Sequence, residues 1–493
     1  MRFSVLAGAL ALCLLLDGCA HSGGLHPGAA LTDPATLKSD RSLADVPLSP
    51  TAWPAQDWWR ALGDRQLDAL INEALQHNPD LAQAQARARL AQASADGADA
   101  ARQPNLALEA SASGARLSSK DPIFPQDALG SFAWRKLATL NFSWDLDLWG
   151  GHRAAWEAAL GRSRAAQIDA RAARIQLSVN VARAYVQLGY AFAQQDLAAR
   201  ELARSSKALD LNRRLVEGGL GTPQQLHQAD YQQASAQEQT TAAAHAVDAA
   251  RSSLSVLLGQ GPDRGLSINR PALLDPAPVT LPEQLPVNLL GRRADLVAAR
   301  WQVEAASQDI AAAKTQFLPD LSLGAMAGVI ATGDRTNVFQ LPARAYSVAP
   351  ALSLPIFDGG RLRAQLATAD AHYDEAVERY NSVLIGALNQ VAELVSALQS
   401  TRLQLAQEER AQQDAQHGWD DALRSYHGGV SGPLSALISQ QQLLAADQRL
   451  AALKAQQAEL AIALVDALGG GYVATATATA PSAAASMAAR PSE

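Results

Sequence analysis

Four stretches of the chain alternate between apolar and polar residues, which is the pattern of a half-buried β-strand. In the clearest one, every even position from Leu140 to Leu148 is apolar, and every odd position from Asn141 to Asp147 is Asn, Ser or Asp. Successive side chains of a strand point to opposite faces, so each strand has one apolar and one polar face. This pattern predicts strands at residues of about 104–114, 138–149, 318–330 and 345–357.

Two much longer stretches carry apolar residues at helical spacing with no internal proline. They run from Arg153 to Val216 and from Arg361 to His427, or ~95 to 100 Å each at 1.5 Å per residue. Both end in Gly-Gly followed by proline, which is a strong stop signal for a helix. A shorter helical stretch follows each stop. The sequence therefore predicts two helical hairpins, at residues 153–258 and 361–468.

The same order of elements is written twice along the chain. Asp80 and Asp295 are 215 positions apart, and Pro104 and Pro319 have the same spacing. The glycine turn after the second strand also recurs, as Trp149-Gly150-Gly151 and as Asp358-Gly359-Gly360. A repeat of this length is one structural unit made twice, with several elements in each copy.

The duplication and the composition of the connecting segments divide the chain into six parts. We predict a signal peptide at residues 1–18, an extended tether at 19–51 and the first repeat at 52–260. An equatorial linker rich in proline follows at 261–287, then the second repeat at 288–470 and a disordered tail of low complexity at 471–493.

The N-terminus has the pattern of a bacterial lipoprotein signal. Arg2 precedes an apolar run that is too short for a permanent membrane helix. Leu16-Asp17-Gly18-Cys19 then resembles a lipobox, although Asp17 departs from the small residue usual there. We expect lipidation of Cys19, which would leave the mature chain with one cysteine at its first position. The alternative is an ordinary signal peptide with a chance cysteine.

Composition and motifs argue against nucleic-acid binding and against catalysis. The net charge is -7, and the nine histidines follow no metal-ligand or protease spacing. Asp145 and Asp147 could be an acid pair, but the polar lining of a lumen explains them better. Arg293 and Asp295 are expected to form a local ion pair at a helix start. The predicted catalytic residues, metal ligands and cofactors are therefore none.

Dyadic strands of about ten residues match the length that spans an outer membrane as a β-barrel. Four strands cannot close a barrel, and open edges are not tolerated in lipid. Two chains would give eight strands with a filled interior, whereas three chains give twelve strands with room for an aqueous lumen. Because the polar strand face needs a lumen, the sequence favours a homotrimer.

At this point the residues resemble a known family, the TolC-type outer-membrane efflux proteins, in the lipoprotein (NodT-like) branch that serves resistance-nodulation-division pumps. The resemblance spans residues of about 52 to 470 and rests on the order and duplication of short motifs rather than on any one of them. Those motifs are Asn78-Pro79-Asp80-Leu81, Pro104, Trp149-Gly150-Gly151, Arg292-Arg293-Ala294-Asp295-Leu296, Leu318-Pro319-Asp320-Leu321, Pro355-Ile356-Phe357-Asp358-Gly359-Gly360 and Gly428-Gly429-Val430.

The resemblance implies an α+β membrane protein, in which a trimeric 12-stranded β-barrel continues into a periplasmic α-helical barrel. It implies a passive duct in the outer membrane for small toxic compounds or drugs, with a periplasmic adaptor and an inner-membrane pump as partners. The alternative within transport is a duct for type I protein secretion. A trimeric adhesin or scaffold belongs to a different class, and no sequence is left over for its passenger domain.

The resemblance also points to the helical tips as the working sites. The two glycine turns are expected to contact the adaptor: Gly218, Gly219, Gly221, Pro223, Gly428, Gly429, Gly432 and Pro433. The family often has an acidic ring just after the second Gly-Val, where this chain has Ser431, so that ring does not carry over. Candidates for a periplasmic gate are instead Asp420, Asp421, Arg424, Tyr426, Val430, Ser431 and Leu434. The simpler interpretation is that these acids face solvent or pair with arginines.

Overall fold

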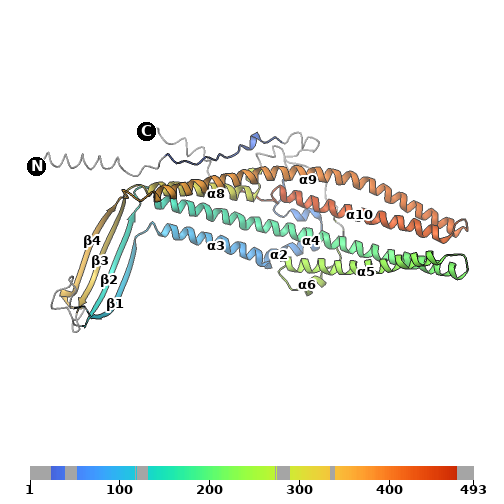
Figure 1. Ribbon diagram of the computed structural model, residues 1–493, viewed down its shortest axis with the longest axis horizontal. Helices are drawn as coiled ribbons and strands as arrows, with labels where there is room; N and C mark the ends of the chain where they lie inside the picture. The colour runs from blue at the N-terminus through green and yellow to red at the C-terminus, as the bar shows by residue number, and fades with distance from the viewer. Residues whose placement is uncertain are drawn as a thin grey trace.

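The structure is a computed structural model, and it describes residues 24–38, 53–116, 118, 132–272, 274, 289–332 and 339–474. A four-stranded sheet forms one end of an elongated molecule, and long helices run from it to two hairpin tips at the other end (Figure 1). The predicted signal peptide with Cys19, and the tail beyond residue 474, lie outside the described residues. The helices and the four strands per chain confirm the predicted α+β class.

The sheet is an antiparallel meander in the order β1-β2-β3-β4. Its strands are β1 (Asn105–Arg116), β2 (Phe132–Leu146), β3 (Asp320–Thr332) and β4 (Arg344–Ser353). One row across all four strands is apolar: Leu106 lies opposite Phe142, Phe142 opposite Ala325 and Ala325 opposite Val348. No part of the described chain covers this face, so Leu108 is 74% exposed and Tyr346 is 85% exposed.

The strand ends differ from the predicted ones for local reasons. β2 begins at Phe132, six residues before the predicted start at 138. The prediction began too late because Lys136 interrupts the apolar alternation, although Lys136 lies in register opposite Ala112. β3 begins just after Pro319, since proline has no N–H to give to the ladder. β4 ends at Ser353 rather than 357, before Pro355.

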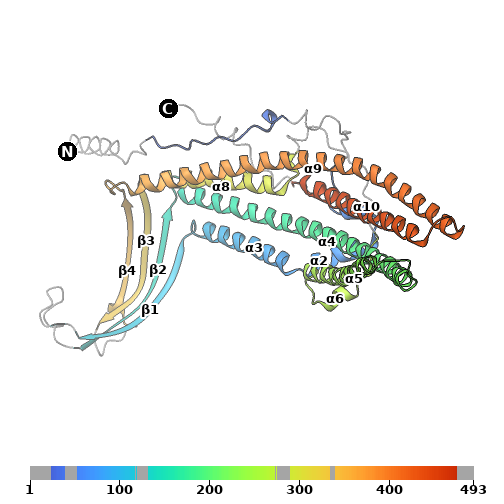
Figure 2. The same ribbon diagram turned by 45° about the vertical axis from the view of Figure 1, so that its right-hand side comes forward.

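The helices extend the meander as one curved wall. α3 (Pro79–Ala100) packs against α4 (Gly151–Glu217), α4 against α8 (Ala294–Thr315), and α8 against α9 (Arg361–His427). Beyond the middle of the molecule, α5 (Pro223–Leu257) takes the place of α3, and α10 (Pro433–Ala467) takes the place of α8. Figure 2 shows α3, α4, α8 and α9 side by side, in the same order as the strands. The helical hairpins were predicted at 153–258 and 361–468, within two residues of these ends.

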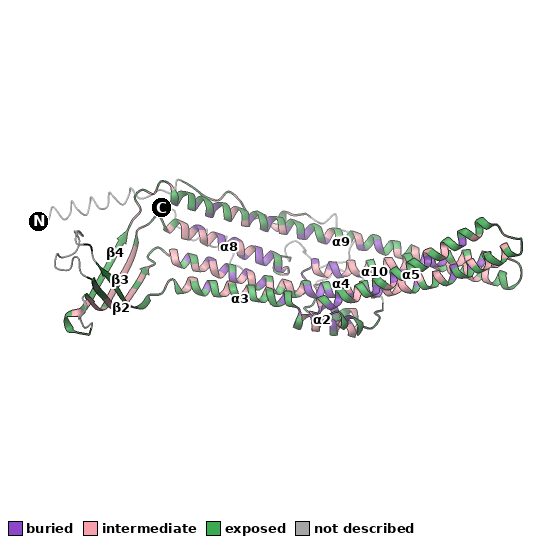
Figure 3. Ribbon diagram, turned by 60° about the horizontal axis from the view of Figure 1, so that its bottom comes forward, coloured by how far each residue is buried: buried purple, intermediate pink, exposed green. Residues whose placement is uncertain are grey.

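The buried core lies at the middle of the wall, where Figure 3 shows most of the buried residues. The first cluster joins α2 (Arg65–His77) and the turn η2 (Trp58–Leu62) to α4 and α5. Within it, the buried Tyr185 hydroxyl donates to Asp64 at 2.8 Å, and Asp64 also caps α2. Burial and this carboxylate raise the pKa of Tyr185. The second cluster joins η4 (Leu289–Gly291) to α9 and α10.

Several small elements complete the described chain. They are the short helix α6 (Asp263–Leu266), which packs on α5, and the turns η1 (Pro34–Thr36) and η5 (Leu341–Ala343). One window of α9 is long and apolar enough to pass as a membrane helix by composition. Three apolar residues of α9, Val377, Leu384 and Val391, are buried in the cluster with α8, α10 and η4, so they form a packing face of the helix.

Residues 24–38, here called the N-terminal strap, lie along α9 instead of hanging free as an extended tether. The Gly28 N–H donates to the Asp374 carboxylate at 3.0 Å. The Thr32 N–H donates to the Asn381 side-chain oxygen at 2.8 Å. Three apolar side chains of the strap pack against the second core cluster: Ala29, Leu31 and Leu37. The predicted tether of residues 19–51 is therefore held on the helix over this part.

The second repeat also extends further than predicted. Tyr472 is 4% exposed and packs in a cluster with Ile168 and Trp301, and Ala474 donates its N–H to Gly291. The predicted disordered tail from residue 471 is thus wrong for residues 471–474. Gly469, Gly470 and Gly471 all have positive φ, which lets the chain turn sharply into this site.

Candidate functional site

The two helical tips have nearly the same backbone. At the first tip the N–H groups of Leu220 and Gly221 both donate to the Leu215 carbonyl, at 2.8 and 2.9 Å. At the second tip Val430 and Ser431 donate to the Ser425 carbonyl, at 2.9 and 3.2 Å. These bonds satisfy carbonyls that a helix end would otherwise leave unpaired. Each turn needs a left-handed residue, which Gly219 and Gly429 supply, both at φ 72°.

The tips differ at the start of the return helix. Thr222 and Gln225 form a capping box at the first tip, each side chain bonding the other residue's N–H. At the second tip the corresponding residue is Gly432, which has no side chain to cap α10. The first turn of α5 is therefore capped by side chains, whereas the first turn of α10 has no such cap.

The structure places the predicted gate residues on the last two turns of α9 and on the second tip. Asp421 forms an ion pair with Arg424, and Asp420 accepts a 3.1 Å hydrogen bond from Gln416. Asp421 thus pairs with an arginine, as the simpler interpretation expects, whereas Asp420 is bonded to a glutamine. The Ser431 hydroxyl is buried and has no partner within the described chain. The remaining gate candidates are apolar or aromatic and partly exposed: Tyr426, Val430 and Leu434. The gating role of these residues stays a prediction.

The predicted tip residues lie together at the far end of the wall from the sheet (Figure 1). Leu220 and Val430 project from the two tips and are 82% and 85% exposed. Each tip thus presents one exposed apolar side chain at the end of its helical hairpin. Adaptor binding by the two glycine turns stays a prediction.

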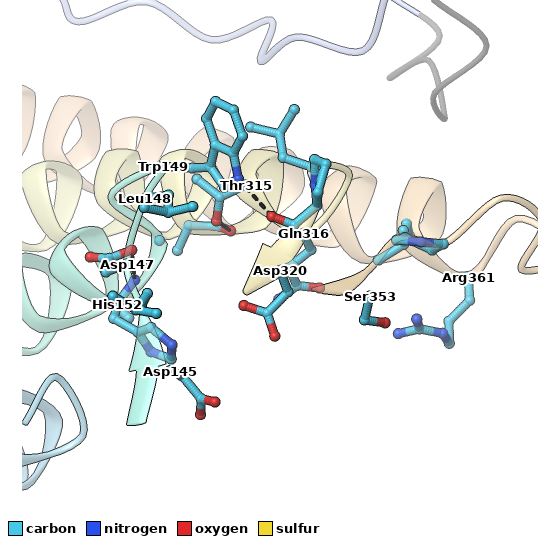
Figure 4. Close-up of a pocket in the computed structure, with 18 residues that line it drawn as sticks. Asp145, Asp147, Leu148, Trp149, His152, Thr315, Gln316, Asp320, Ser353 and Arg361 are labelled. Carbon is cyan, nitrogen blue, oxygen red and sulfur yellow. Dashed lines mark hydrogen bonds between the residues drawn. The ribbon is translucent and has the colours of Figure 1, made fainter. Parts of the chain in front are cut away.

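A second polar site lies where the sheet meets the helices. The sequence pattern pointed to Asp145 and Asp147 there, but not to a cavity. A cavity of about 460 Å³ is lined there by residues from the ends of β2 and β3 and from the starts of α4 and α9. Figure 4 shows Asp145, Asp147 and Asp320 on its wall, with His152 beside them. The Trp149 ring N–H donates to the Pro319 carbonyl at 2.7 Å and ties the two repeats together.

Two acids near this junction, Asp147 and Asp358, cap the long helices. Asp147 accepts the N–H groups of His152 and Arg153, at 3.1 and 2.8 Å, and so caps α4. Asp358 does the same for α9 through Gly360 and Leu362, and these N–H groups lower its pKa. The signal in the sequence was an Asp shortly before each Gly-Gly. Asp147 is therefore a helix cap that lies just beyond the end of β2.

The predicted local pair at the start of α8 is present. Arg293 and Asp295 form an ion pair at 2.7 Å, and Arg293 also donates to the Ala467 carbonyl at 3.0 Å. The half-buried Asp466 lies close by, and burial raises the pKa of its carboxyl. Within the described parts of the chain, no three His, Cys, Asp or Glu side chains gather as metal ligands.

Comparisons with known proteins agree on one family. The model of the outer membrane efflux protein family matches residues 70–260 and 285–470. Among curated proteins, the fusaric acid resistance protein FusA of Burkholderia cepacia is 38% identical over 73% of this chain and 68% of its own length. The multidrug resistance outer membrane protein MdtP of Escherichia coli K12 is 32% identical over 87% of this chain and 89% of its own length.

Solved structures give the same picture. The outer membrane protein VceC of Vibrio cholerae is 36% identical, with a TM-score of 0.75, over 85% of this chain and 100% of VceC. The outer-membrane channel OprN is 28% identical, with a TM-score of 0.78, over 91% of this chain and 99% of OprN. These likenesses cover both repeats and the sheet as well as the helices.

Proposed function

This chain belongs to the outer membrane efflux protein family, and from that membership we propose that three copies form one passive exit duct of a tripartite pump. The observation that carries the proposal is the open four-stranded sheet. β1 and β4 are its edges, and its apolar face is uncovered. A sheet with two open edges is not tolerated in the hydrocarbon core of a membrane, so other copies must supply the missing strands.

The number three follows from the need for a lumen. Two chains would close eight strands, whose interior is filled by side chains, whereas three close twelve. The row opposite the apolar one carries Asn105, Ser143 and Asp145 in β1 and β2, and these polar residues suit a wet lumen. A homotrimer satisfies both faces of the sheet at once.

The helices would extend the lumen into the periplasm. α4 and α9 each have 67 residues, which is about 100 Å of helix. Their tips would meet a periplasmic adaptor, which in turn would meet an inner-membrane pump of the resistance-nodulation-division type. Asp420, Asp421, Arg424, Tyr426, Val430, Ser431 and Leu434 would narrow the closed duct at its periplasmic end. The chain itself would act as a conduit, not as an enzyme, with the pump supplying the energy.

The N-terminal strap supports the proposed lipid anchor at Cys19. Gly28 is bonded to Asp374, which lies thirteen residues or about 20 Å along α9 from Arg361 at the sheet end. The strap runs from there toward the middle of the molecule, since Thr32 meets Asn381. Nine residues separate Cys19 from Gly28, and an extended chain of that length reaches about 30 Å. A lipid on Cys19 could therefore reach the membrane beside the barrel.

Deleting the gene should test the efflux function directly. We expect higher sensitivity to several unrelated toxicants, including fusaric acid, dyes and detergents, with an unchanged profile of secreted proteins. Re-expression of the full chain should restore resistance, and growth without toxicant is the control. Loss of one secreted protein with unchanged sensitivity would instead identify a type I secretion duct.

A further inference from the structure

Asp370 is a buried carboxylate of α9 that has no partner in the fold. Its side chain is 6% exposed, and neither of its oxygens has a hydrogen-bond partner within the described chain. Burying a charge is costly unless it is paired, and protonation would remove the charge but leave an O–H group without an acceptor. The position does not require an acid, because α4 and α9 start 210 positions apart and Leu160 is its counterpart in α4. The carboxylate therefore calls for a ligand.

A second carboxylate, that of Asp374, lies one helical turn further along α9. Residues four apart on a helix are neighbours, with Cβ atoms about 5–6 Å apart, and like charges at that spacing repel each other. Asp374 Oδ1 accepts the N–H groups of Gly28 and Ala29, at 3.0 and 2.8 Å. These donors are neutral, so they do not balance the charge of either acid. Two negative charges are thus placed side by side, and one of them is buried.

The N-terminal strap passes beside both acids. Gly28 meets Asp374 and Thr32 meets Asn381, so four strap residues advance by seven helix residues, or about 10 Å along α9. Asp370 lies about 6 Å nearer to the sheet than Asp374. At the same rate of advance, the strap reaches the level of Asp370 two to three residues before Gly28. The backbone of the strap therefore runs next to the buried carboxylate.

The strap brings backbone groups to this point but no countercharge. The titratable residue at that level is His26, whose ring Nδ1 lies 3.2 Å from the Pro27 carbonyl oxygen rather than against the acid. The remaining charged residues of the strap, Asp33 and Lys38, follow Thr32 and lie further toward the middle of α9. The surroundings thus offer carboxylate and carbonyl oxygens, which are the ligands of a hard cation.

We propose that Asp370 and Asp374 bind a calcium ion together with backbone carbonyl oxygens of the strap. Ca²⁺ takes oxygen ligands from carboxylates, carbonyls and water in a flexible geometry, whereas Mg²⁺ demands a near-ideal octahedron. Such a site needs no third acid or histidine, so it differs from the three-residue metal clusters that the described parts of the chain lack. The ion fastens the strap to α9. This role goes beyond the proposed duct and does not depend on it.

Calcium binding to the purified full-length protein in detergent tests the proposal. Equilibrium dialysis with radioactive calcium should show about one Ca²⁺ per chain, and Ca²⁺ should slow amide hydrogen exchange in the strap. For a Kd of about 0.1 mM, typical of extracellular calcium modules, about 1 mM Ca²⁺ should slow exchange at Gly28, Ala29 and Thr32 by about tenfold relative to a chelator. Mg²⁺ at the same concentration should have a smaller effect.

Three variants decide whether Asp370 holds the ion. Asp370→Asn keeps the size of the side chain but removes its charge, so the bound calcium and the slower exchange should both be lost. Asp370→Leu, which copies the first repeat, should hold the strap equally well with calcium or chelator. Glu375→Gln is the matched control, because Glu375 lines a cavity on another face of α9 beside His372, and this variant should respond like the unmodified protein.

Two results would overturn the calcium site and leave the proposed duct untouched. One is a strap in the unmodified protein that exchanges at the same rate in calcium and in chelator. The other is an Asp370→Asn protein that still binds calcium and still shows the slower exchange.

Discussion

Gly469 is a position where one added methyl group should strongly destabilise the fold. Its φ is +95°, a conformation that costs an L side chain about 1–2 kcal/mol. A Cβ there would overlap the Arg292 carbonyl oxygen and lie 2.8 Å from the carbonyl carbon. Because this atom belongs to the backbone that starts α8, relieving the clash would add about 1–3 kcal/mol of strain. Gly469→Ala should therefore destabilise the fold by about 2–5 kcal/mol.

Two control glycines separate the parts of this effect. Gly63 has φ +73° but no atom within 4 Å of a built Cβ, so Gly63→Ala carries the conformational cost alone. Gly386 lies within α9 with open space and no positive φ, so Gly386→Ala should not destabilise. At about 2 °C for each kcal/mol, the melting midpoint should fall by about 4–10 °C for Gly469→Ala and about 2–4 °C for Gly63→Ala.

The midpoint should be followed by circular dichroism of the detergent-solubilised protein at one protein concentration and one scan rate, because unfolding of such assemblies is often irreversible. Gly259, the counterpart of Gly469, has its Cβ position 2.9 Å from the His77 carbonyl carbon, so Gly259→Ala should behave like Gly469→Ala. Equal midpoints for Gly469→Ala and Gly63→Ala would refute the clash argument.

Three further predictions concern the tips, the middle of the wall and the strap. Thr222→Ala removes the capping box and lowers the stability of the start of α5 by about 1 kcal/mol. Amide hydrogen exchange there should therefore become about fivefold faster. Gly432→Thr adds a capping side chain at the second tip, so exchange at the start of α10 should become slower. Burial raises the pKa of the Asp466 carboxyl, so ionisation of this group destabilises the folded state. The protein should keep its full stability below the ordinary carboxyl pKa of about 4 and lose part of it as the pH rises through the raised pKa of Asp466. Asp466→Asn should thus raise the melting midpoint at pH 7 but not at pH 4, and an equal gain at both would contradict this sign. Asp374→Ala removes the acceptor of the Gly28 N–H, so limited proteolysis should cut the strap faster while the native trimer keeps its size.

Regular periodicity allowed most of the fold to be predicted from the sequence. The four strands and the long hairpins follow from apolar alternation and from the proline-free runs between Gly-Gly stops. Lys136 shows where this fails, because one charged residue on the apolar face hid the first six residues of β2. The alternation pattern reflects whether each side chain lies in an apolar or a polar environment. Near the membrane surface a strand residue can carry a charged side chain that reaches water while its backbone stays in the sheet.

Neither the N-terminal strap nor the packed segment at residues 471–474 could be predicted from the sequence, and the reason here is different. Both are held in part by backbone N–H and C=O groups, which every residue carries, and the few apolar side chains that pack there follow no period. Asp374 and Asn381 look like ordinary polar residues of an exposed helix face until the strap is in place. Tyr472 was the available signal, since a lone aromatic residue after three glycines is unusual in a disordered tail.

In the proposed duct, the contact between the two repeats of one chain and the contact between neighbouring chains would share a backbone arrangement but differ in their charged residues. Within the chain, Arg162 pairs with Asp309, and Arg200 pairs with Asp447 at 3.0 Å. By the spacing of the repeats, the positions of Arg162 and Asp309 are taken by His372 and Ser94 at the joint with a neighbouring copy. Those of Arg200 and Asp447 are taken by Arg410 and Gln237, so neither ion pair recurs there. Exposed ion pairs contribute about 0.2–1 kcal/mol each, too little to hold the wall together. The Arg162–Asp309 pair would favour α8 over a neighbour's α3 beside α4 by up to about fivefold, and the Arg200–Asp447 pair would favour the chain's own α10 over a neighbour's α5 by a similar factor.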